Sequence, residues 1–99
     1  MKIHTKAVHA GDRKKTGRYV PVTAPIHTAS SFFYDDMEQL DRIFSQEEAG
    51  FCYARYDNPT NAALEELLAS LENGHGALAC SSGLAAIQMA VMSALADRR

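Results

Sequence analysis

Residues 79–86, which read Ala-Cys-Ser-Ser-Gly-Leu-Ala-Ala, constrain the fold more than any other stretch. The apolar run at residues 77–80 is short and follows two glycines, which predicts a buried β-strand. Over residues 83–96 the apolar side chains recur at the spacing of one helical face, at Leu84, Ile87, Val91 and Leu95. We therefore expect a strand, a tight turn and a helix that begins near Ser82 or Gly83.

The start of this expected helix is suited to an anion such as phosphate. The first amides of a helix have no partner within it, and the helix dipole makes this end partially positive. Gly83 has no side chain, so a ligand could approach the backbone there. The same pattern also fits an ordinary packing turn, so the upstream residues decide its meaning.

Composition sets broad limits on function. The chain has 99 residues, of which 46% are apolar and 22% charged, as in ordinary globular domains. A net charge of −2 argues against general affinity for nucleic acid or membranes, and the apolar runs fall well short of the roughly 20 residues of a membrane helix. The amino terminus lacks the pattern of a secretory signal. Cys52 and Cys80 are expected to be reduced thiols, and no histidine has partners at metal-ligand spacing. These features favour a cytoplasmic protein.

The amino-terminal third shows little regular periodicity. Ile3, Ala7 and Val8 can line one short helix, and residues 12–30 are expected to be mostly irregular. Within them, residues 12–18 are polar and basic, as in an exposed loop. Residues 19–28 contain two prolines, which hold the chain extended and exclude it from a central strand. Such an apolar arm often lies across another surface.

Two further helices are expected before the serine-glycine turn. Asp36 can cap the first, with Gln39 in the capping-box position. For the second, over residues 59–73, Asn58 is a favoured N-cap and Pro59 a favoured first residue. The apolar faces of the two helices consist of Met37, Leu40, Ile43 and Phe44 in the first and Leu64, Leu67, Leu68 and Leu71 in the second.

One short strand and several amphipathic helices leave apolar faces with too little to cover them. A strand followed by a helix normally returns to a parallel neighbour, and no second strand is evident before residue 99. We therefore expect the amino-terminal part of a larger α/β protein.

Three motifs occur in order along the chain: Tyr53-Ala-Arg55, Asn58-Pro-Thr60 and the Ser-Ser-Gly sequence that ends at Gly83. Together they resemble the amino-terminal part of the pyridoxal-phosphate-dependent enzymes of cysteine and methionine metabolism, or trans-sulfuration family. This family includes cystathionine γ-synthase, cystathionine lyases, methionine γ-lyase and O-acetylhomoserine sulfhydrylase. The resemblance implies an α/β fold of fold type I, like aspartate aminotransferase, with residues 1–58 as an arm and dimer-contact segment and residues 59–99 as the start of the cofactor-binding large domain.

The resemblance also implies a cofactor site. Tyr53 and Arg55 match the family's pair that reaches across a dimer interface to the phosphate of the neighbouring subunit's pyridoxal 5'-phosphate. Ser82, Gly83 and Leu84 match the turn whose backbone amides hold the phosphate of the chain's own cofactor. A guanidinium, a phenol and free amides are donors suited to phosphate. Without the resemblance, a surface arginine paired with Asp57 and a core tyrosine remain the simpler interpretations.

The chain departs from the family pattern at several positions. Leu84 replaces the usual methionine, Ala54 stands where serine or threonine is common, and Asp57 puts a carboxylate near Arg55. His27 occupies a position that is usually aromatic or polar and is interpreted as structural.

The reaction centre is expected outside these residues. The family's chemistry needs a lysine that forms a Schiff base with the cofactor. The lysines here, Lys2, Lys6, Lys14 and Lys15, all lie in the arm and none matches it. We therefore expect the 99-residue piece alone to be inactive and assign it no catalytic residue.

The leading hypothesis is that the parent enzyme performs γ-elimination or γ-replacement on cystathionine, methionine or an O-acyl-homoserine. The resemblance implies a homo-oligomer, a dimer with shared sites assembled into a tetramer, with no nucleic-acid or membrane partner. The alternative is a stand-alone, non-catalytic dimerisation or phosphate-binding module. A serine hydrolase at Ser81 or Ser82 is disfavoured, because the Gly-x-Ser-x-Gly elbow is absent.

Overall fold

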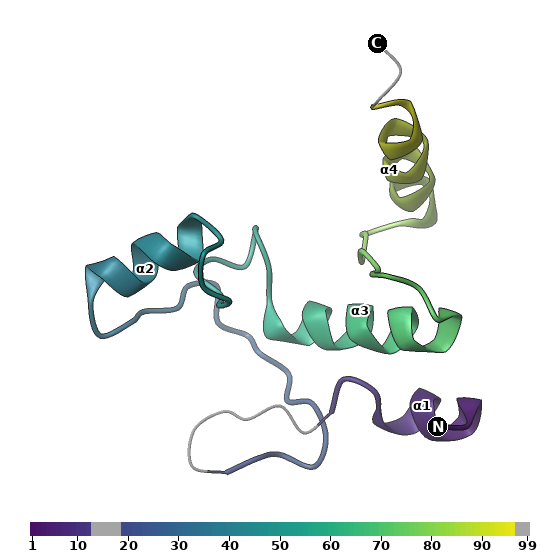
Figure 1. The fold of residues 1–99 in the computed structure, drawn as a ribbon, viewed down its shortest axis with the longest axis horizontal. Coiled ribbons are helices and arrows are strands. Elements are labelled where there is room, and N and C mark those ends of the chain that lie inside the picture. Colours follow the sequence, from purple (N-terminus) through teal and green to yellow (C-terminus); the bar gives the residue numbers. More distant parts are fainter. Residues whose placement is uncertain (13–18, 97–99) are drawn as a thin grey trace.

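The computed structural model describes residues 1–12 and 19–96. Within these residues the chain forms four α-helices: α1 at Ile3–His9, α2 at Met37–Phe44, α3 at Pro59–Glu72 and α4 at Gly83–Leu95. Figure 1 shows α1 lying alongside α3, α2 at the far end of the irregular arm, and α4 projecting away from α3. The four helices agree with the periodicity of the sequence, and α2, α3 and α4 begin at the expected cap residues.

Helix α3 begins and ends as its sequence predicts. The Asn58 side chain accepts a hydrogen bond from the Thr60 amide at 2.8 Å, and Pro59 occupies the first helical position. At the other end Asn73 adopts the left-handed conformation, with φ of 51°, and its amide donates to Ala69 O. A left-handed residue of this kind is a common helix stop. The helix predicted over residues 59–73 is confirmed.

The arm docks on α3 through its first helix. The Lys6 ammonium donates to Ser70 O at 3.0 Å and to the Asn73 side chain at 2.9 Å, so it caps the carboxyl end of α3. Gly11 follows with φ of +89°, and a Cβ atom there would lie 2.5 Å from Ala63 O. Only glycine can therefore bring the arm this close to α3.

Helix α2 confirms half of its predicted capping box. The Asp36 carboxylate accepts from the Gln39 amide at 2.6 Å. The reciprocal bond, in which the Gln39 side-chain oxygen would accept from the Asp36 amide, is not formed among the described residues; the Gln39 Nε2 group donates to Glu48 at 3.1 Å. Arg42 also pairs with Glu48 at 3.1 Å, and these two donors lower the pKa of Glu48. The Gln39 side chain is thus oriented toward a carboxylate beyond the helix.

Residues 30–32 and 52–54 run antiparallel, and hydrogen bonds between them fix the segment that leads to α3. Ala54 N–H donates to Ser30 O at 2.7 Å and Phe32 N–H donates to Cys52 O at 3.2 Å. A single bridge joins Ser31 to Tyr53. The irregular structure expected over residues 12–30 is confirmed for Asp12 and residues 19–30, while residues 13–18 lie outside the described part of the chain.

The predicted buried strand over residues 77–80 is wrong in this structure. The segment has no regular secondary structure, Leu78 is 63% exposed and Cys80 is exposed. A strand needs a neighbour to accept its backbone hydrogen bonds, and no other strand lies beside it among the described residues. The Ala79 amide is instead bonded to the Glu65 carboxylate at 2.8 Å. The sheet expected for an α/β fold is therefore not formed by this stretch.

The described residues enclose almost no core. Ile43, at 7% exposure, is the one large apolar side chain among them that is buried. The radius of gyration is 15.7 Å, larger than the roughly 13 Å of a compact chain of this length. Many large apolar side chains are consequently open to solvent, above all along α4.

Candidate functional site

The turn before α4 has the geometry of a helix start. Ser82 is extended, with φ of −153° and ψ of 160°, and its hydroxyl accepts from the Ala85 amide at 3.1 Å. The amides of Gly83 and Leu84 are the first two of the helix, which have no partner within it. No atom lies within 4 Å of the position of a Cβ on Gly83, so the backbone is open to an incoming group. The predicted helix start at Ser82 and Gly83 is confirmed.

Tyr53 and Arg55 lie on a tight turn before α3. The amides of Tyr56 and Asp57 both donate to Tyr53 O, at 3.0 and 3.2 Å. The exposed Arg55 guanidinium lies over the rings of Tyr53 and Tyr56, with 5.4 Å from its carbon to each centroid. A cation in this position is attracted by both rings. Tyr53 is 41% exposed, so the interpretation as a core tyrosine is wrong for this structure.

Asp57 does not neutralise Arg55. Its carboxylate accepts from the neighbouring Asn58 amide at 2.8 Å. Among the described residues no ion pair joins Asp57 to Arg55, so the interpretation as a surface ion pair is wrong here too. The guanidinium can therefore offer its donors to an external anion.

The two groups of candidate residues do not come together within one chain. Ser82, Gly83 and Leu84 lie at the start of α4, whereas Tyr53 and Arg55 lie on the turn that precedes α3. Figure 1 shows these two segments well separated, with the whole of α3 and the connecting segment between them in the sequence. The two groups could contact one common ligand only if a second chain or a large rearrangement supplied one of them.

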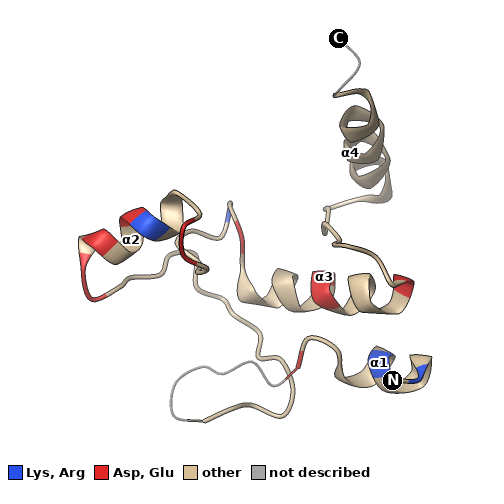
Figure 2. Cartoon of the chain, viewed as in Figure 1, with Lys and Arg blue, Asp and Glu red and all other residues tan. Residues whose placement is uncertain are grey.

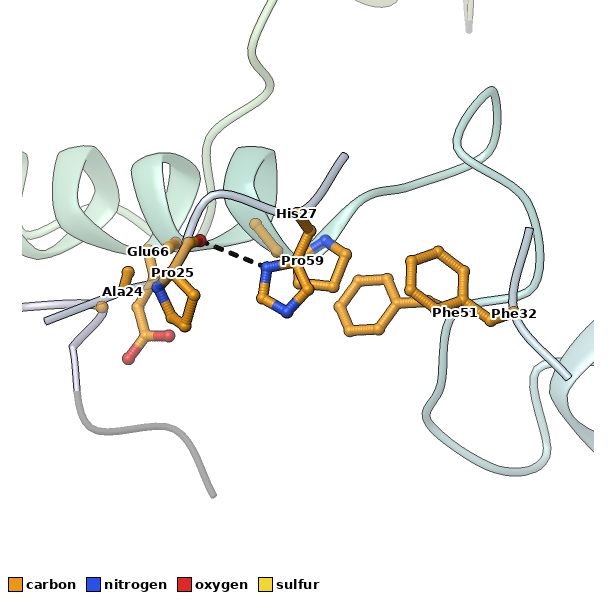
Figure 3. Close-up of a pocket in the computed structure, with 10 residues that line it drawn as sticks. Ala24, Pro25, His27, Phe32, Phe51, Pro59 and Glu66 are labelled. Atoms are coloured by element: carbon orange, nitrogen blue, oxygen red, sulfur yellow. Dashed lines mark hydrogen bonds between the residues drawn. The ribbon is translucent and has the colours of Figure 1, made fainter. Parts of the chain in front are cut away.

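A cavity of about 480 Å³ lies between the arm and α3 and was not anticipated from the sequence. Figure 3 shows the His27 ring among the lining residues, with Phe32 and Phe51 to one side and Pro25 and Glu66 to the other. The His27 amide donates to the Thr60 hydroxyl at 2.8 Å, and its ring Nδ1 lies 3.2 Å from Pro25 O. These contacts agree with a structural role for His27. The arm therefore lies across α3, as its two prolines indicated.

Charge is distributed unevenly over the molecule. Figure 2 shows the positions of charged residues on α1, α2 and α3 but none on α4. Large side chains of α4 remain exposed, including Leu84 at 79% and Ile87 at 60%. Over the residues that the structure describes, no helix is long and apolar enough to cross a membrane. The same residues contain no cluster of three or more side chains arranged to hold a metal ion.

This chain is similar to known enzymes of one family. The family model described as Cys/Met metabolism PLP-dependent enzyme matches residues 4–97. The L-methionine gamma-lyase of Fusobacterium nucleatum subsp. polymorphum is 43% identical over 93 residues, which cover 94% of this chain and 23% of that protein. The O-acetyl-L-homoserine sulfhydrylase of Corynebacterium glutamicum is 38% identical, covering 92% of this chain and 21% of that enzyme.

Solved structures agree with this class. An O-acetylhomoserine (thiol)-lyase from Campylobacter jejuni, which contains a pyridoxyl-lysine monophosphate, superposes with a TM-score of 0.82 at 28% identity. The match covers 93% of this chain and 22% of that structure. A cystathionine gamma-lyase from Lactobacillus plantarum gives a TM-score of 0.72 at 34% identity, over 95% of this chain and 22% of that one.

The fold is therefore that of the amino-terminal part of a fold type I, pyridoxal-phosphate-dependent enzyme. More specifically, the chain belongs to the family of pyridoxal-phosphate-dependent enzymes of cysteine and methionine metabolism. It spans less than a quarter of the length of the curated relatives it matches.

Pyridoxal phosphate is the cofactor of this family, and the residues present fit its phosphate group. The α4 start offers free amides beside an open glycine, and Arg55 offers a guanidinium without a carboxylate partner among the described residues. Both are donor types that bind phosphate in proteins.

Proposed function

We propose that this chain is the phosphate-binding, amino-terminal part of an enzyme that performs γ-elimination or γ-replacement on a sulfur amino acid or an O-acyl-homoserine. Membership of the family carries the proposal, because its relatives include lyases and sulfhydrylases with this chemistry in their names. Residues 59–99 would begin the cofactor-binding domain, and residues 1–58 would form the arm and dimer contact. The enzyme would act in the cytoplasm.

The chain's own contribution is to hold the cofactor in place. The amides of Gly83 and Leu84 would donate to the phosphate, and the partial positive charge of the helix start would favour its negative charge. The Ser82 hydroxyl accepts from Ala85 N–H, and its own proton is left to be donated to the phosphate as a third hydrogen bond. Once bound, the cofactor supplies the electron sink for the reaction.

Arg55 and Tyr53 would complete the phosphate site of a neighbouring subunit. Their separation from the α4 start within one chain supports this placement. The guanidinium would bind two phosphate oxygens, and the Tyr53 phenol would add a hydroxyl donor. A dimer with two shared sites follows, and two such dimers would form a tetramer.

The first experiment measures cofactor affinity in the protein that carries this chain. Arg55→Ala should weaken pyridoxal phosphate binding by about 1.5–3 kcal/mol, as expected for the loss of charge-assisted hydrogen bonds. Titration followed by absorbance gives the dissociation constant. Arg42→Ala is the matched control, because Arg42 pairs with Glu48 on α2 and should leave the affinity unchanged. Unchanged affinity in the Arg55 variant would refute the phosphate role.

A mixing experiment tests the placement across subunits. Arg55→Ala protein is combined with a variant of the same enzyme that lacks its Schiff-base lysine. If Arg55 serves the neighbouring subunit, each mixed dimer has one site with both lesions and one intact site, so activity partly returns. If exchange of subunits is demonstrated and activity stays absent, the cross-subunit placement is wrong while the phosphate role can stand.

A second candidate function is a non-catalytic phosphate-binding or dimerisation module made by residues 1–99 alone. One observation favours it, namely that all of the proposed phosphate ligands lie within this short stretch. The module should bind pyridoxal phosphate and form dimers in gel filtration as an isolated chain. The leading proposal instead expects the isolated chain to be inactive and only marginally folded, because its apolar faces lack covering layers.

A further inference from the structure

Tyr56 occupies a place beside the candidate phosphate ligand that the motifs did not single out. Its ring centroid lies 5.4 Å from the Arg55 guanidinium carbon, the same distance as that of Tyr53. The two rings meet at a steep angle, with centroids 6.4 Å apart and planes inclined at 65°. The guanidinium thus rests against a corner formed by two aromatic side chains.

The rings of Tyr53 and Tyr56 restrict the side chain of Arg55, which in the proposed function must point toward a phosphate. An exposed arginine samples many rotamers, and fixing it on binding costs conformational entropy. Attraction to two rings reduces that freedom before any ligand arrives. An aromatic ring contacts a guanidinium through the guanidinium's π-surface. The N–H donors of the guanidinium lie in the guanidinium plane and remain available.

Tyr56 is itself held from two sides. Its amide donates to Tyr53 O at 3.0 Å, which closes the turn that carries Arg55. Its ring packs edge-on against Phe44 at the end of α2, with centroids 6.1 Å apart and planes at 78°. The Tyr56 ring is nevertheless 65% exposed, so this packing fixes it without enclosing it in a core.

We infer that Tyr56 is a positioning residue that orients the Arg55 guanidinium toward the cofactor phosphate, with Phe44 supporting its ring. This inference rests on the proposed phosphate role of Arg55. Tyr56 acts through its aromatic face and does not itself contact the phosphate. Its hydroxyl is therefore dispensable and its ring is not.

The test compares two substitutions in the full-length protein. Tyr56→Leu removes the ring and should weaken pyridoxal phosphate binding about two- to fivefold, the size of an exposed cation–π contact. Tyr56→Phe keeps the ring and should retain the affinity of the unmodified protein. Tyr19→Leu is a matched control, because Tyr19 is another exposed tyrosine, 75% accessible, on the arm. Binding of pyridoxal, which lacks the phosphate, should be the same in all variants.

A double-mutant cycle separates positioning from a general structural effect. In the Arg55→Ala background, Tyr56→Leu should cause no further loss of affinity, because the side chain that it orients is gone. A further loss in that background, or equal weakening of pyridoxal binding, would overturn the inference and indicate that Tyr56 supports the turn. Full affinity in Tyr56→Leu would also overturn it.

The outcomes for Arg55 and Tyr56 are distinguishable. If Arg55→Ala leaves cofactor affinity unchanged, the proposed phosphate role fails and the inference fails with it. If Arg55→Ala weakens binding while Tyr56→Leu does not, the phosphate role stands and only the positioning role of Tyr56 is lost.

Discussion

Helices α3 and α4 are nearly equal in length, but they differ in how many tertiary contacts the rest of the chain makes with them. Helix α3 is contacted by α1, capped by Lys6 from the arm and bonded through Thr60 to His27. Helix α4 packs against no other helix among the described residues. Its apolar side chains are more exposed, as with Leu84 at 79% against Leu68 of α3 at 43%.

The difference shows that amphipathic pattern and tertiary contact are separate requirements. Helix α3 offers polar groups at both ends and small residues along one side, which lets an irregular arm dock without a large apolar core. Helix α4 carries no charged residue, so burial of its apolar surface is what would stabilise its position. Its sequence is that of a helix covered on several sides by other layers.

The largest expected contrast comes from two glycines, one at each helix. Gly11→Ala should destabilise the docked arm by about 2–4 kcal/mol, because the new Cβ meets Ala63 O and the positive φ is disfavoured. Gly83→Ala should change stability by less than about 0.5 kcal/mol, because its Cβ position is open. Urea unfolding of both variants measures the change in the free energy of unfolding that each substitution causes. Equal losses would show that α4 depends on close contacts at its start that are absent here.

The hydrogen bond between the arm and α3 gives a smaller effect. Thr60→Val removes the acceptor of the His27 amide and should cost about 1–2 kcal/mol, because that half-buried N–H is left without a partner. Thr60→Ser keeps the hydroxyl and should restore most of the stability. Urea unfolding with hydrogen exchange at the His27 amide reports both. Slow exchange at His27 in the valine variant would contradict this account of arm docking.

The smallest contrast lies in the two N-caps. Asn58→Ala and Ser82→Ala each remove a side-chain acceptor for a helix amide, worth about 1 kcal/mol. For Asn58 the loss should appear in global unfolding, since α3 is tied to the arm. For Ser82 it should appear only as faster hydrogen exchange within α4. If Ser82→Ala lowers global stability as much as Asn58→Ala, the two helices unfold as one unit and the comparison fails.

The local features of the fold could be read from individual residues. Asn58, Pro59 and Ser82 marked helix starts correctly because capping depends on neighbours within three or four positions. Arg55 and Gly83 could be proposed as phosphate ligands only through the family resemblance of their motifs, and this role stays a prediction. Tyr56 could not, because its role depends on where the turn places its ring relative to Arg55.

The sequence by itself determined the helices, their caps and the donor types of the candidate site, since all of these depend on short-range geometry. Only the tertiary structure decided which distant residues these helices and side chains contact. It left residues 77–80 without a strand, because a strand requires a partner that no local pattern can supply. It also paired the Gln39 side chain with Glu48 and placed the arm across α3, since such contacts depend on which distant groups the fold brings within hydrogen-bonding distance.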